Sequence, residues 1–297
     1  MTHRKAVWVM VAAALLWSIA GVVSRHLEAA RGFEVTFWRS GFNALALVVL
    51  LSWLKGPAPL WAALRGGGRA LWLSGACWAV MYTAFMMALT LTSVANVLVT
   101  MAIGPLLTAL LARAALGHRL ERRTWGAIAL AGVGIAWMYG HEVVGSDPRA
   151  LLGTLVALAV PMAAAVNWTL LQHLKGHDSP PDMLSAVLIG AALSAAVTLP
   201  LAWPLAASAH DLSLLALLGV VQLAIPCLMA VAAARVLSGP EISLLGLLEV
   251  VFGVLWAWLG AGEAPSAAVL GGGALVLAAL VGNELLGLRQ RIRFASP

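Results

Sequence analysis

Charged side chains are scarce in this chain: Asp, Glu, Lys and Arg together make up 10% of its 297 residues, whereas 62% are hydrophobic and the mean hydropathy is +0.95. A soluble domain carries roughly 25% charged residues. With so few, the chain cannot cover a folded surface that faces water on all sides. The composition therefore excludes a soluble globular fold and predicts an integral membrane protein.

The signatures of catalysis, metal binding and ATP hydrolysis are also missing. The two cysteines, Cys77 and Cys227, both fall within apolar stretches, so neither a disulfide framework nor a metal site follows. The seven histidines show no metal-binding spacing, and the sequence has no HExxH or GxSxG motif and no pair of intramembrane aspartates. No GxxxxGK[ST] phosphate-binding loop occurs, so the chain does not itself hydrolyse ATP. We expect no enzyme activity, no metal and no cofactor.

Long apolar stretches occupy most of the chain. A helix that spans a bilayer needs about 20 mostly apolar residues. Ten stretches qualify: about 7–24, 35–54, 70–90, 92–116, 124–140, 150–172, 182–204, 211–235, 240–262 and 266–287. Each is longer and more uniformly apolar than a barrel strand, so we expect helices. The predicted fold is an all-α membrane protein with ten transmembrane helices. Residues 3–23 resemble a signal peptide, but they lack a small-x-small site and are interpreted as the first helix.

Positive charges fall mainly on one side of the predicted helices. If the N-terminus is cytoplasmic, fourteen Lys and Arg residues lie in cytoplasmic connections, and only Arg25, Arg31, Arg39 and Arg149 lie in the others. This positive-inside bias predicts that both termini are cytoplasmic. It also explains the net charge of +6 without a nucleic-acid partner. The expected partners are the lipid bilayer and a small-molecule substrate, and the protein is expected to be a monomer or a homodimer.

The chain contains a faint internal repeat. A shift of 145 residues aligns 93–126 with 238–271 without a gap, and it pairs the fourth predicted helix with the ninth and the fifth with the tenth. We therefore expect two repeats of five helices, residues 1–145 and 146–297. Because five is odd, the repeats enter the membrane in opposite directions, and such inverted repeats are typical of secondary transporters. Some channels also contain inverted repeats, so a channel or a structural membrane subunit is an alternative.

Four short motifs, in order, are similar to those of a known family. They are ALLWSIAGVVSR at 14–25, FWRSGFNAL at 37–45, IGPLLTALLARAALGHRL at 103–120 and LLEVVFGVLWAWLGAGEAPS at 247–266. With them the chain resembles the EamA-type, ten-helix members of the drug/metabolite transporter superfamily. His118 stands where that family has the glutamate of a GE pair, and Val250 where it has the proline of an LEP motif. The resemblance implies a transporter of the bacterial inner membrane that works by alternating access. Export of amino acids or related compounds is the first expectation. Drug or organic-cation efflux and metabolite uptake are the alternatives.

A single charged residue, Glu249, interrupts the apolar stretch SLLGLLEVVFGVLWAWLG at residues 243–260. At about 1.5 Å per residue from a start near residue 240, it lies about 13 Å deep, near the centre of a hydrocarbon core about 30 Å thick. A carboxylate that faced lipid at this depth would be costly. We therefore expect Glu249 to face the bundle interior and to bind a substrate ammonium or a proton. The alternative is a structural bond to a neighbouring helix.

Other polar and aromatic side chains are predicted at a similar depth. The candidate substrate-binding residues are Trp17, Ser18, Trp78, Tyr82, Thr100, Gln222 and Glu249, and Glu249 is also the candidate for proton coupling. Each has a simpler interpretation as well: the tryptophans pack, Gln222 bonds between helices, and the hydroxyls of Ser18 and Thr100 bond to their own helix.

Four residues near the middle of predicted helices are expected to bend them. They are Gly104, Pro105, Pro161 and Pro226. Proline removes a backbone donor and frees a carbonyl, and Gly104 directly precedes one of these prolines. Arg39, one turn inside the second predicted helix, is expected to snorkel or to pair locally rather than to bind substrate.

Overall fold

The computed structural model of the protein describes residues 1–92, 94–117, 121–143, 148–175, 182–261 and 267–295, and every regular element in these ranges is helical. The elements are α1 (His3–Trp17), α2 (Ala20–Ser24), α3 (Phe33–Lys55), α4 (Pro57–Gly66), α5 (Gly68–Leu91), α6 (Val94–Met101), α7 (Gly104–Leu116), α8 (Arg122–Val143), α9 (Pro148–Leu174), α10 (Leu184–Ala202), α11 (Ala209–Leu217), the π-helical segment η1 (Leu218–Ala224), α12 (Ile225–Ala234), α13 (Gly239–Gly246), α14 (Leu248–Ala261) and α15 (Ala267–Ala295).

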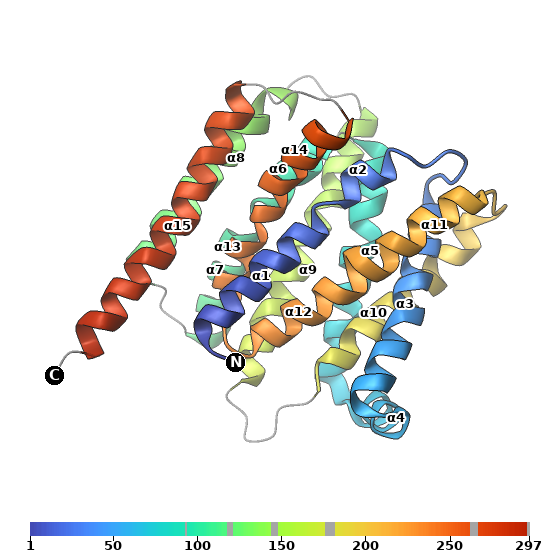
Figure 1. Ribbon diagram of the computed structural model, residues 1–297, viewed down its shortest axis with the longest axis horizontal. Helices are drawn as coiled ribbons and strands as arrows, with labels where there is room; N and C mark the ends of the chain where they lie inside the picture. The colour runs from blue at the N-terminus through green and yellow to red at the C-terminus, as the bar shows by residue number, and fades with distance from the viewer. Residues whose placement is uncertain (93, 118–120, 144–147, 176–181, 262–266, 296–297) are drawn as a thin grey trace.

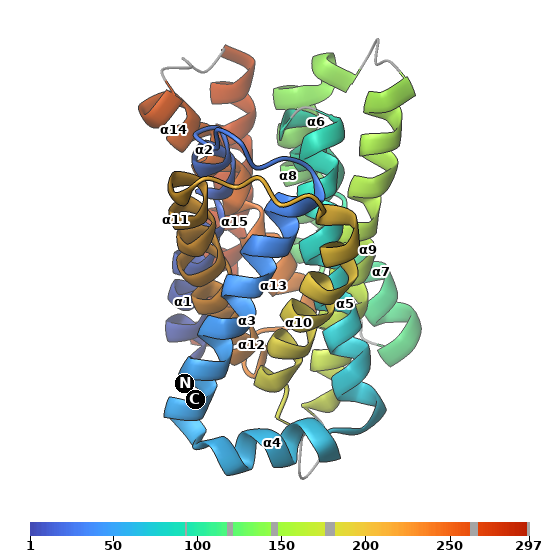
Figure 2. The ribbon, with the colours of Figure 1, turned by 90° about the vertical axis from the view of Figure 1, so that its right-hand side faces the viewer.

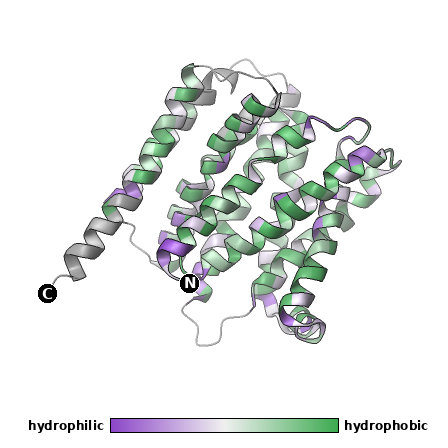
Figure 3. Ribbon diagram, viewed as in Figure 1, coloured by the Kyte–Doolittle hydropathy of each residue, from purple (hydrophilic) through white to green (hydrophobic). Residues whose placement is uncertain are grey.

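Seven helical runs in the described residues are long and apolar enough to cross a membrane. They are His3–Ser24, Phe33–Lys55, Gly68–Leu91, Leu151–Leu174, Leu184–Ala202, Ala209–Ala234 and Gly239–Gly260. Gly104–Leu116 and Leu270–Asn283 are shorter apolar helices. Hydrophobic residues dominate along the helices, and hydrophilic ones gather at helix ends and connections (Figure 3). The protein is therefore a multi-pass, all-helical membrane protein.

The long helices run side by side as a bundle, and α4 lies across one end of it (Figures 1 and 2). α8 packs along α15 at one edge, while α3, α5, α9 and α10 pack against one another on the other side. The end of the bundle at which α1 begins is called the amino-terminal end below. The opposite end, which holds the connections 25–32 and 203–208, is called the far end.

Close packing between α5 and α10 depends on glycine. A Cβ atom on Gly190 would lie 2.3 Å from the Cβ of Trp78, and one on Gly75 would lie 2.5 Å from Cγ2 of Ile189. Small residues let membrane helices approach until their backbones nearly touch, which compensates for the missing hydrophobic drive in lipid. This contact fixes the position of α5, and with it the position of Trp78 and Tyr82.

Two buried carboxylates tie the connections together at the far end. Asp211 accepts hydrogen bonds from the backbone N–H groups of Glu28, Ala29 and Ala30, at 2.8, 2.9 and 2.9 Å. Glu34 accepts from the backbone N–H groups of 206 and 207, at 2.7 and 2.8 Å. Loops at membrane depth need partners for their polar backbone, and these acids supply them.

Several helices are broken in the interior of the bundle. α1 gives way to α2 after Trp17, α6 to α7 after Met101, and α13 to α14 after Gly246. A π-helical segment, η1, lies between α11 and α12. Irregular backbone at membrane depth is tolerated where it is buried in protein or lines a cavity, and π segments often mark functional sites. The breaks therefore direct attention to the space that they surround.

Candidate functional site

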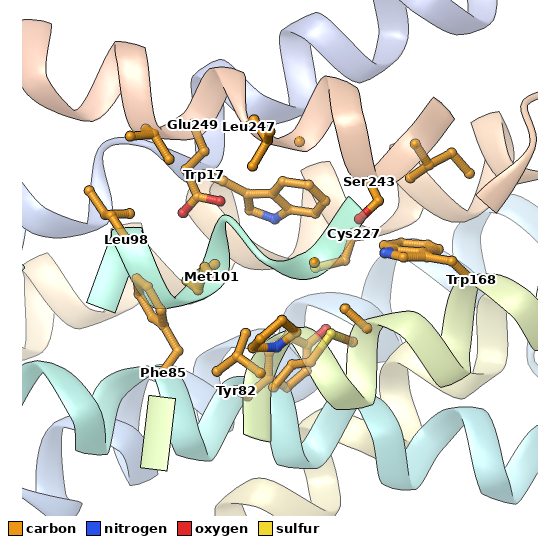
Figure 4. A pocket seen from close by; sticks show the side chains of 18 of the residues that line it. Trp17, Tyr82, Phe85, Leu98, Met101, Trp168, Cys227, Ser243, Leu247 and Glu249 are labelled. Carbon is orange, nitrogen blue, oxygen red and sulfur yellow. The ribbon is translucent and has the colours of Figure 1, made fainter. Parts of the chain in front are cut away.

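A cavity of about 140 Å³ lies where the broken helices meet. Residues of α1, α3, α5, α6, α7, α9, η1, α12, α13 and α14 line it. Most of its wall is apolar or aromatic, and Figure 4 shows Trp17, Tyr82, Phe85 and Trp168 around the space. The ring centroid of Trp78 lies 5.6 Å from those of both Tyr82 and Trp168, so three aromatic rings form one continuous wall. A concave, largely apolar pocket with a few polar groups is the usual form of a small-molecule site.

Glu249 enters the cavity from the first turn of α14 (Figure 4). The break after Gly246 places its carboxylate beside the start of a helix, where the helix dipole favours negative charge. No described residue donates a hydrogen bond to this carboxylate or forms an ion pair with it. The cavity thus holds an acid without a partner among the described residues.

Arg39 contributes the opposite charge from α3. It is 2% exposed, and its Nε and Nη2 donate to Oε1 of Gln222 at 3.2 and 2.9 Å. Its Cζ atom also lies 5.7 Å from the centroid of the Phe85 ring. The expectation that Arg39 snorkels or pairs locally is wrong, because its partner is 183 positions away and its head group lies in the cavity wall. Because Arg39 lies near a predicted helix end, the count of positive charges had also placed it in a connection.

Gln222 joins three helices around Arg39. While its Oε1 accepts from the guanidinium, its Nε2 donates to the backbone carbonyl of Trp17 at 3.2 Å. That carbonyl is left without its helical donor because α1 ends there. Gln222 therefore matches the interpretation of a bond between helices, and it also lines the cavity.

The remaining predicted residues differ in their surroundings. Trp17, Trp78 and Tyr82 line the cavity, whereas Ser18 lines only a smaller adjoining cavity, and Thr100 lies buried outside both. The Ser18 hydroxyl donates to the Leu15 carbonyl at 2.7 Å and accepts from Nε1 of Trp256 at 2.8 Å. It is thus occupied by the protein itself.

The four expected helix-bending residues lie at different kinds of position. Gly104 and Pro105 line the cavity and open α7 directly after the break that follows α6. Pro161 also lines the cavity but lies inside the unbroken helix α9. Pro226 is in the first turn of α12, just after η1, and lies outside the cavity lining.

The two ends of the bundle differ in what lies next to the cavity. A second space of about 40 Å³, which shares Trp17, Phe85, Leu98 and Glu249 with the first, continues toward Arg25 at the far end. At the amino-terminal end, three polar contacts join the helix ends: His3 with Glu241, the Gly239 N–H with Gln172, and Lys175 with the Leu237 carbonyl. A separate cavity of about 320 Å³ lies beyond them, between the ends of α9 and α12.

Several lining residues were not predicted from the sequence. Arg39, Phe85, Trp168, Cys227 and Ser243 all line the cavity. Only Arg39 carried a usable signal, because a basic residue inside an apolar stretch is expected to be functional by default. No group of three His, Cys, Asp or Glu side chains suited to a metal ion occurs in the described part of the chain.

Comparison with known proteins gives one family and one fold. No curated protein matches the chain. Twenty-nine chains of solved structures match it. One of them, described only as the crystal structure of a protein, has a TM-score of 0.76 and 18% sequence identity and covers 99% of this chain and 100% of its own. That similarity shows a shared fold alone. The model of the EamA-like transporter family matches residues 4–140. Residues 4–140 are therefore similar to the EamA-like transporter family.

Proposed function

We propose that the protein is a secondary transporter that moves a small metabolite through the central cavity by alternating access. Amino acids or related compounds, exported across the bacterial inner membrane, are the first substrate class to test. Drug or organic-cation efflux and metabolite uptake are the other activities that this family resemblance allows. The proposal assigns the chain no catalytic role and no cofactor.

The proposal rests on two helices that are broken at corresponding positions of the two repeats. Moved along the chain by 145 residues, the bounds of α6 (Val94–Met101) become those of α13 (Gly239–Gly246). The same shift takes the end of α7, Leu116, to the end of α14, Ala261. Discontinuous helices in corresponding positions of two halves are the best sequence-level indication of a transporter binding site. Gly104 at one break corresponds to Glu249 at the other.

Helix packing supports two inverted repeats of five spans each, residues 1–145 and 146–297. α5 packs on α9 and α10, and in the other half α12 packs on α1 while η1 packs on α3. The pairs α3 with α10, α7 with α13 and α8 with α15 join corresponding helices of the two halves. In this arrangement α1 with α2, α3, α5, α6 with α7, and α8 form the first five spans. α9, α10, α11 to α12, α13 with α14, and α15 form the second five.

Alternating access fits the different contacts at the two ends of the bundle. A transporter must open its site to one side while contacts seal the other. The cavity continues toward the far end, and the polar contacts of Gln172, Lys175 and His3 lie at the amino-terminal end. With the positive-inside bias, the amino-terminal end is proposed to be cytoplasmic, so this state would open outward.

Energy for accumulation would come from a gradient, since the sequence has no ATP-binding loop. Glu249 is the proposed proton site, because no other acidic residue lines the cavity among those that the structure describes. A channel is the competing function from another class. Its pore would need a polar lining along its whole length, whereas the polar groups here gather around Arg39, Gln222 and Glu249.

The decisive experiment is counterflow in proteoliposomes. Vesicles loaded with unlabelled amino acids, organic cations or organic anions are diluted into trace labelled substrate, with and without a pH gradient. We expect saturable exchange for one class, and the Glu249→Gln variant should still exchange substrate at a raised substrate concentration but lose accumulation driven by the pH gradient. Glu28→Gln, an exposed acid outside the cavity, is the matched control. Flux without saturation or counterflow would indicate a channel, and no flux of any class would overturn the proposal.

A further inference from the structure

Arg39 is a buried cation that forms no ion pair with any residue that the structure describes. Its hydrogen bonds go to the neutral amide of Gln222, and its Nη1 has no partner among the described residues. A guanidinium stays protonated in a protein, and burial of a charge without an opposite charge is costly. Arg39 is also the only basic residue in the described cavity lining. No described group of the cavity therefore forms an ion pair with Arg39.

Glu249 presents the complementary deficiency in the same cavity. It is the only acidic residue in the described lining, and no described group donates to it. Arg39 lines the same cavity, yet the two side chains form no ion pair. Arg39 and Glu249 thus place opposite charges in one cavity without forming an ion pair. A molecule that carries both a negative and a positive charge can bind between them.

Two further polar atoms of the wall point to the same chemistry. The Nε1 of Trp78 and the hydroxyl of Tyr82 are buried without a hydrogen-bond partner from the described residues. Native proteins leave few buried donors unpaired, because each costs free energy. With Arg39, this makes three wall residues that can each donate to an acceptor oxygen. A ligand carboxylate supplies two such oxygens.

The rest of the cavity limits the remainder of the ligand. Trp17, Phe85 and Trp168 provide an apolar, aromatic surface, and Met101 also lines the cavity. The volume, about 140 Å³, is close to that of an engineered cavity of about 150 Å³ that takes up benzene. Because this volume also includes the end at Arg39 and Glu249, the apolar part of the ligand can be no larger than an isobutyl or a benzyl group.

We propose that the cavity binds α-amino acids with an apolar side chain as zwitterions, with the carboxylate on Arg39, the ammonium on Glu249 and the side chain among Trp17, Phe85 and Trp168. This rests on the proposed transport function and narrows its substrate class. An organic cation is disfavoured because Arg39 would repel it, and a dicarboxylate because Glu249 would. Arg39 becomes a binding residue that sets specificity.

The first test uses the unmodified protein and removes one charge of the ligand at a time. Binding of L-leucine is compared with that of 3-methylbutylamine, which lacks the carboxylate, 4-methylpentanoate, which lacks the ammonium, and leucinamide, which lacks the negative charge. The corresponding L-phenylalanine series is measured in parallel. A charge-assisted hydrogen bond is strong enough that each truncated compound should bind at least about tenfold more weakly. Equal binding of the amino acid and its amine would overturn the proposal.

The second test assigns each charge to its residue. In Arg39→Gln, leucine should lose at least about tenfold in affinity while 3-methylbutylamine loses nothing, because only leucine has a carboxylate to lose. In Glu249→Gln, leucine should weaken while 4-methylpentanoate does not. Arg123→Gln, whose arginine donates to the Asn283 carbonyl outside the cavity, is the control. Leucine affinities that are the same in Arg39→Gln and Arg123→Gln would contradict the assignment.

These measurements separate the inference from the transport function. If leucine binds with the expected pattern but no substrate crosses the membrane, the site stands and the transporter proposal fails. If an organic cation shows saturable counterflow while neither amino acid binds or competes, transport stands and the zwitterion site is wrong. If only anions bind, Arg39 is an anion site and Glu249 takes no part in it.

Discussion

Gln222 accepts two hydrogen bonds from the guanidinium of Arg39, at 3.2 Å from Nε and 2.9 Å from Nη2. The two residues are 183 positions apart and belong to different proposed repeats. Because Gln222 also donates to the Trp17 carbonyl, one neutral amide orients the buried cation and satisfies the broken end of α1. The position of Arg39 in the cavity wall therefore depends on a residue that carries no charge.

Removal of this amide should destabilise the whole bundle. Gln222→Leu keeps the approximate volume but leaves a buried guanidinium without its acceptor, and a hydrogen bond to a charged group contributes about 1.5–3 kcal/mol. We expect a clear loss of thermal stability in detergent, measured as the unfolding midpoint.

A double variant separates charge from shape at the same position. If the cost comes from the unpaired charge, Arg39→Met combined with Gln222→Leu should recover most of the stability, since apolar replacement of both partners is often neutral. Recovery would fail if Gln222 acted mainly through the Trp17 carbonyl. The single variant Arg39→Met, measured alone, completes the cycle.

The hydroxyl of Ser18 is expected to matter for packing and not for substrate. It accepts from Nε1 of Trp256 at 2.8 Å and thereby joins the break in α1 to α14. Ser18→Ala should lower the free energy of unfolding by about 1 kcal/mol, the usual net value of one hydrogen bond. Substrate affinity, measured by isothermal titration, should be unchanged. A tenfold loss of affinity with no change in stability would restore Ser18 as a ligand-binding residue.

The depth of a side chain in the membrane could be predicted from the sequence, but the face of the helix on which it lies could not. Counting residues placed Glu249, Trp17, Trp78, Tyr82 and Gln222 near one level, and all five line one cavity. The count gives no information on which face of a helix a side chain occupies, since that depends on the neighbours. Thr100 was predicted at the same depth and lies outside the cavity lining.

Broken helices were the other feature that hydropathy could not predict. The stretch at 92–116 was predicted as one helix with a bend at Gly104 and Pro105, yet it forms two helices, α6 and α7, with Pro105 at the start of the second. Arg39 was wrongly expected to snorkel or to pair locally, because its position was judged only by its distance from a predicted helix end. Its partner, Gln222, could not be identified from the sequence. Long-range partners of this kind arise from packing between helices that are far apart in the sequence.

The α5–α10 contact predicts a pair of glycine variants with opposite effects. A methyl group on Gly190 would overlap the Cβ of Trp78 at 2.3 Å, so Gly190→Ala must push the helices apart, at a typical cost of about 1–3 kcal/mol. The shift should also move Trp78 and weaken substrate binding. Gly41→Ala in α3, where nothing lies within 4 Å of the new methyl, should leave binding intact and stabilise the helix by about 0.5–1 kcal/mol. Equal unfolding midpoints for the two variants would contradict the close contact.

Lys175 should react with acylating reagents at unusually low pH. Burial lowers its pKa to about 8, and the charge of Glu241 opposes this shift only in part. The neutral amine is the nucleophile, so reactivity should be low below pH 8, half-maximal near pH 8 and maximal above it. A lysine with the ordinary pKa of about 10.4 is still almost fully protonated at pH 8. Mass spectrometry can follow Lys175 with Lys5 and Lys55 as references in the same sample, and a half-point near 10 would contradict the buried position.

In the proposed alternating-access cycle, the polar contacts at the amino-terminal end keep that end of the cavity closed. A single amide among them, that of Gln172, should therefore control access to the cavity from that end. Gln172 accepts from the Gly239 N–H at 2.8 Å and so joins α9 to the start of α13. Gln172→Ala removes about 1 kcal/mol from the closed state, which should raise the population open to that end about fivefold. Cys227 lines the cavity and is 1% exposed, so it can report this opening.

The rate of maleimide labelling of Cys227 provides the measurement. In a Cys77→Ser background, Gln172→Ala should label several-fold faster than the parent when the reagent is added at the amino-terminal side. Thr90→Ala removes a hydrogen bond of 2.7 Å to the Met87 carbonyl on α5 and serves as the control. L-leucine at saturation should protect Cys227 in both backgrounds, because the cavity that holds the ligand also holds the thiol. Identical labelling rates in Gln172→Ala and Thr90→Ala would show that this contact does not close the path.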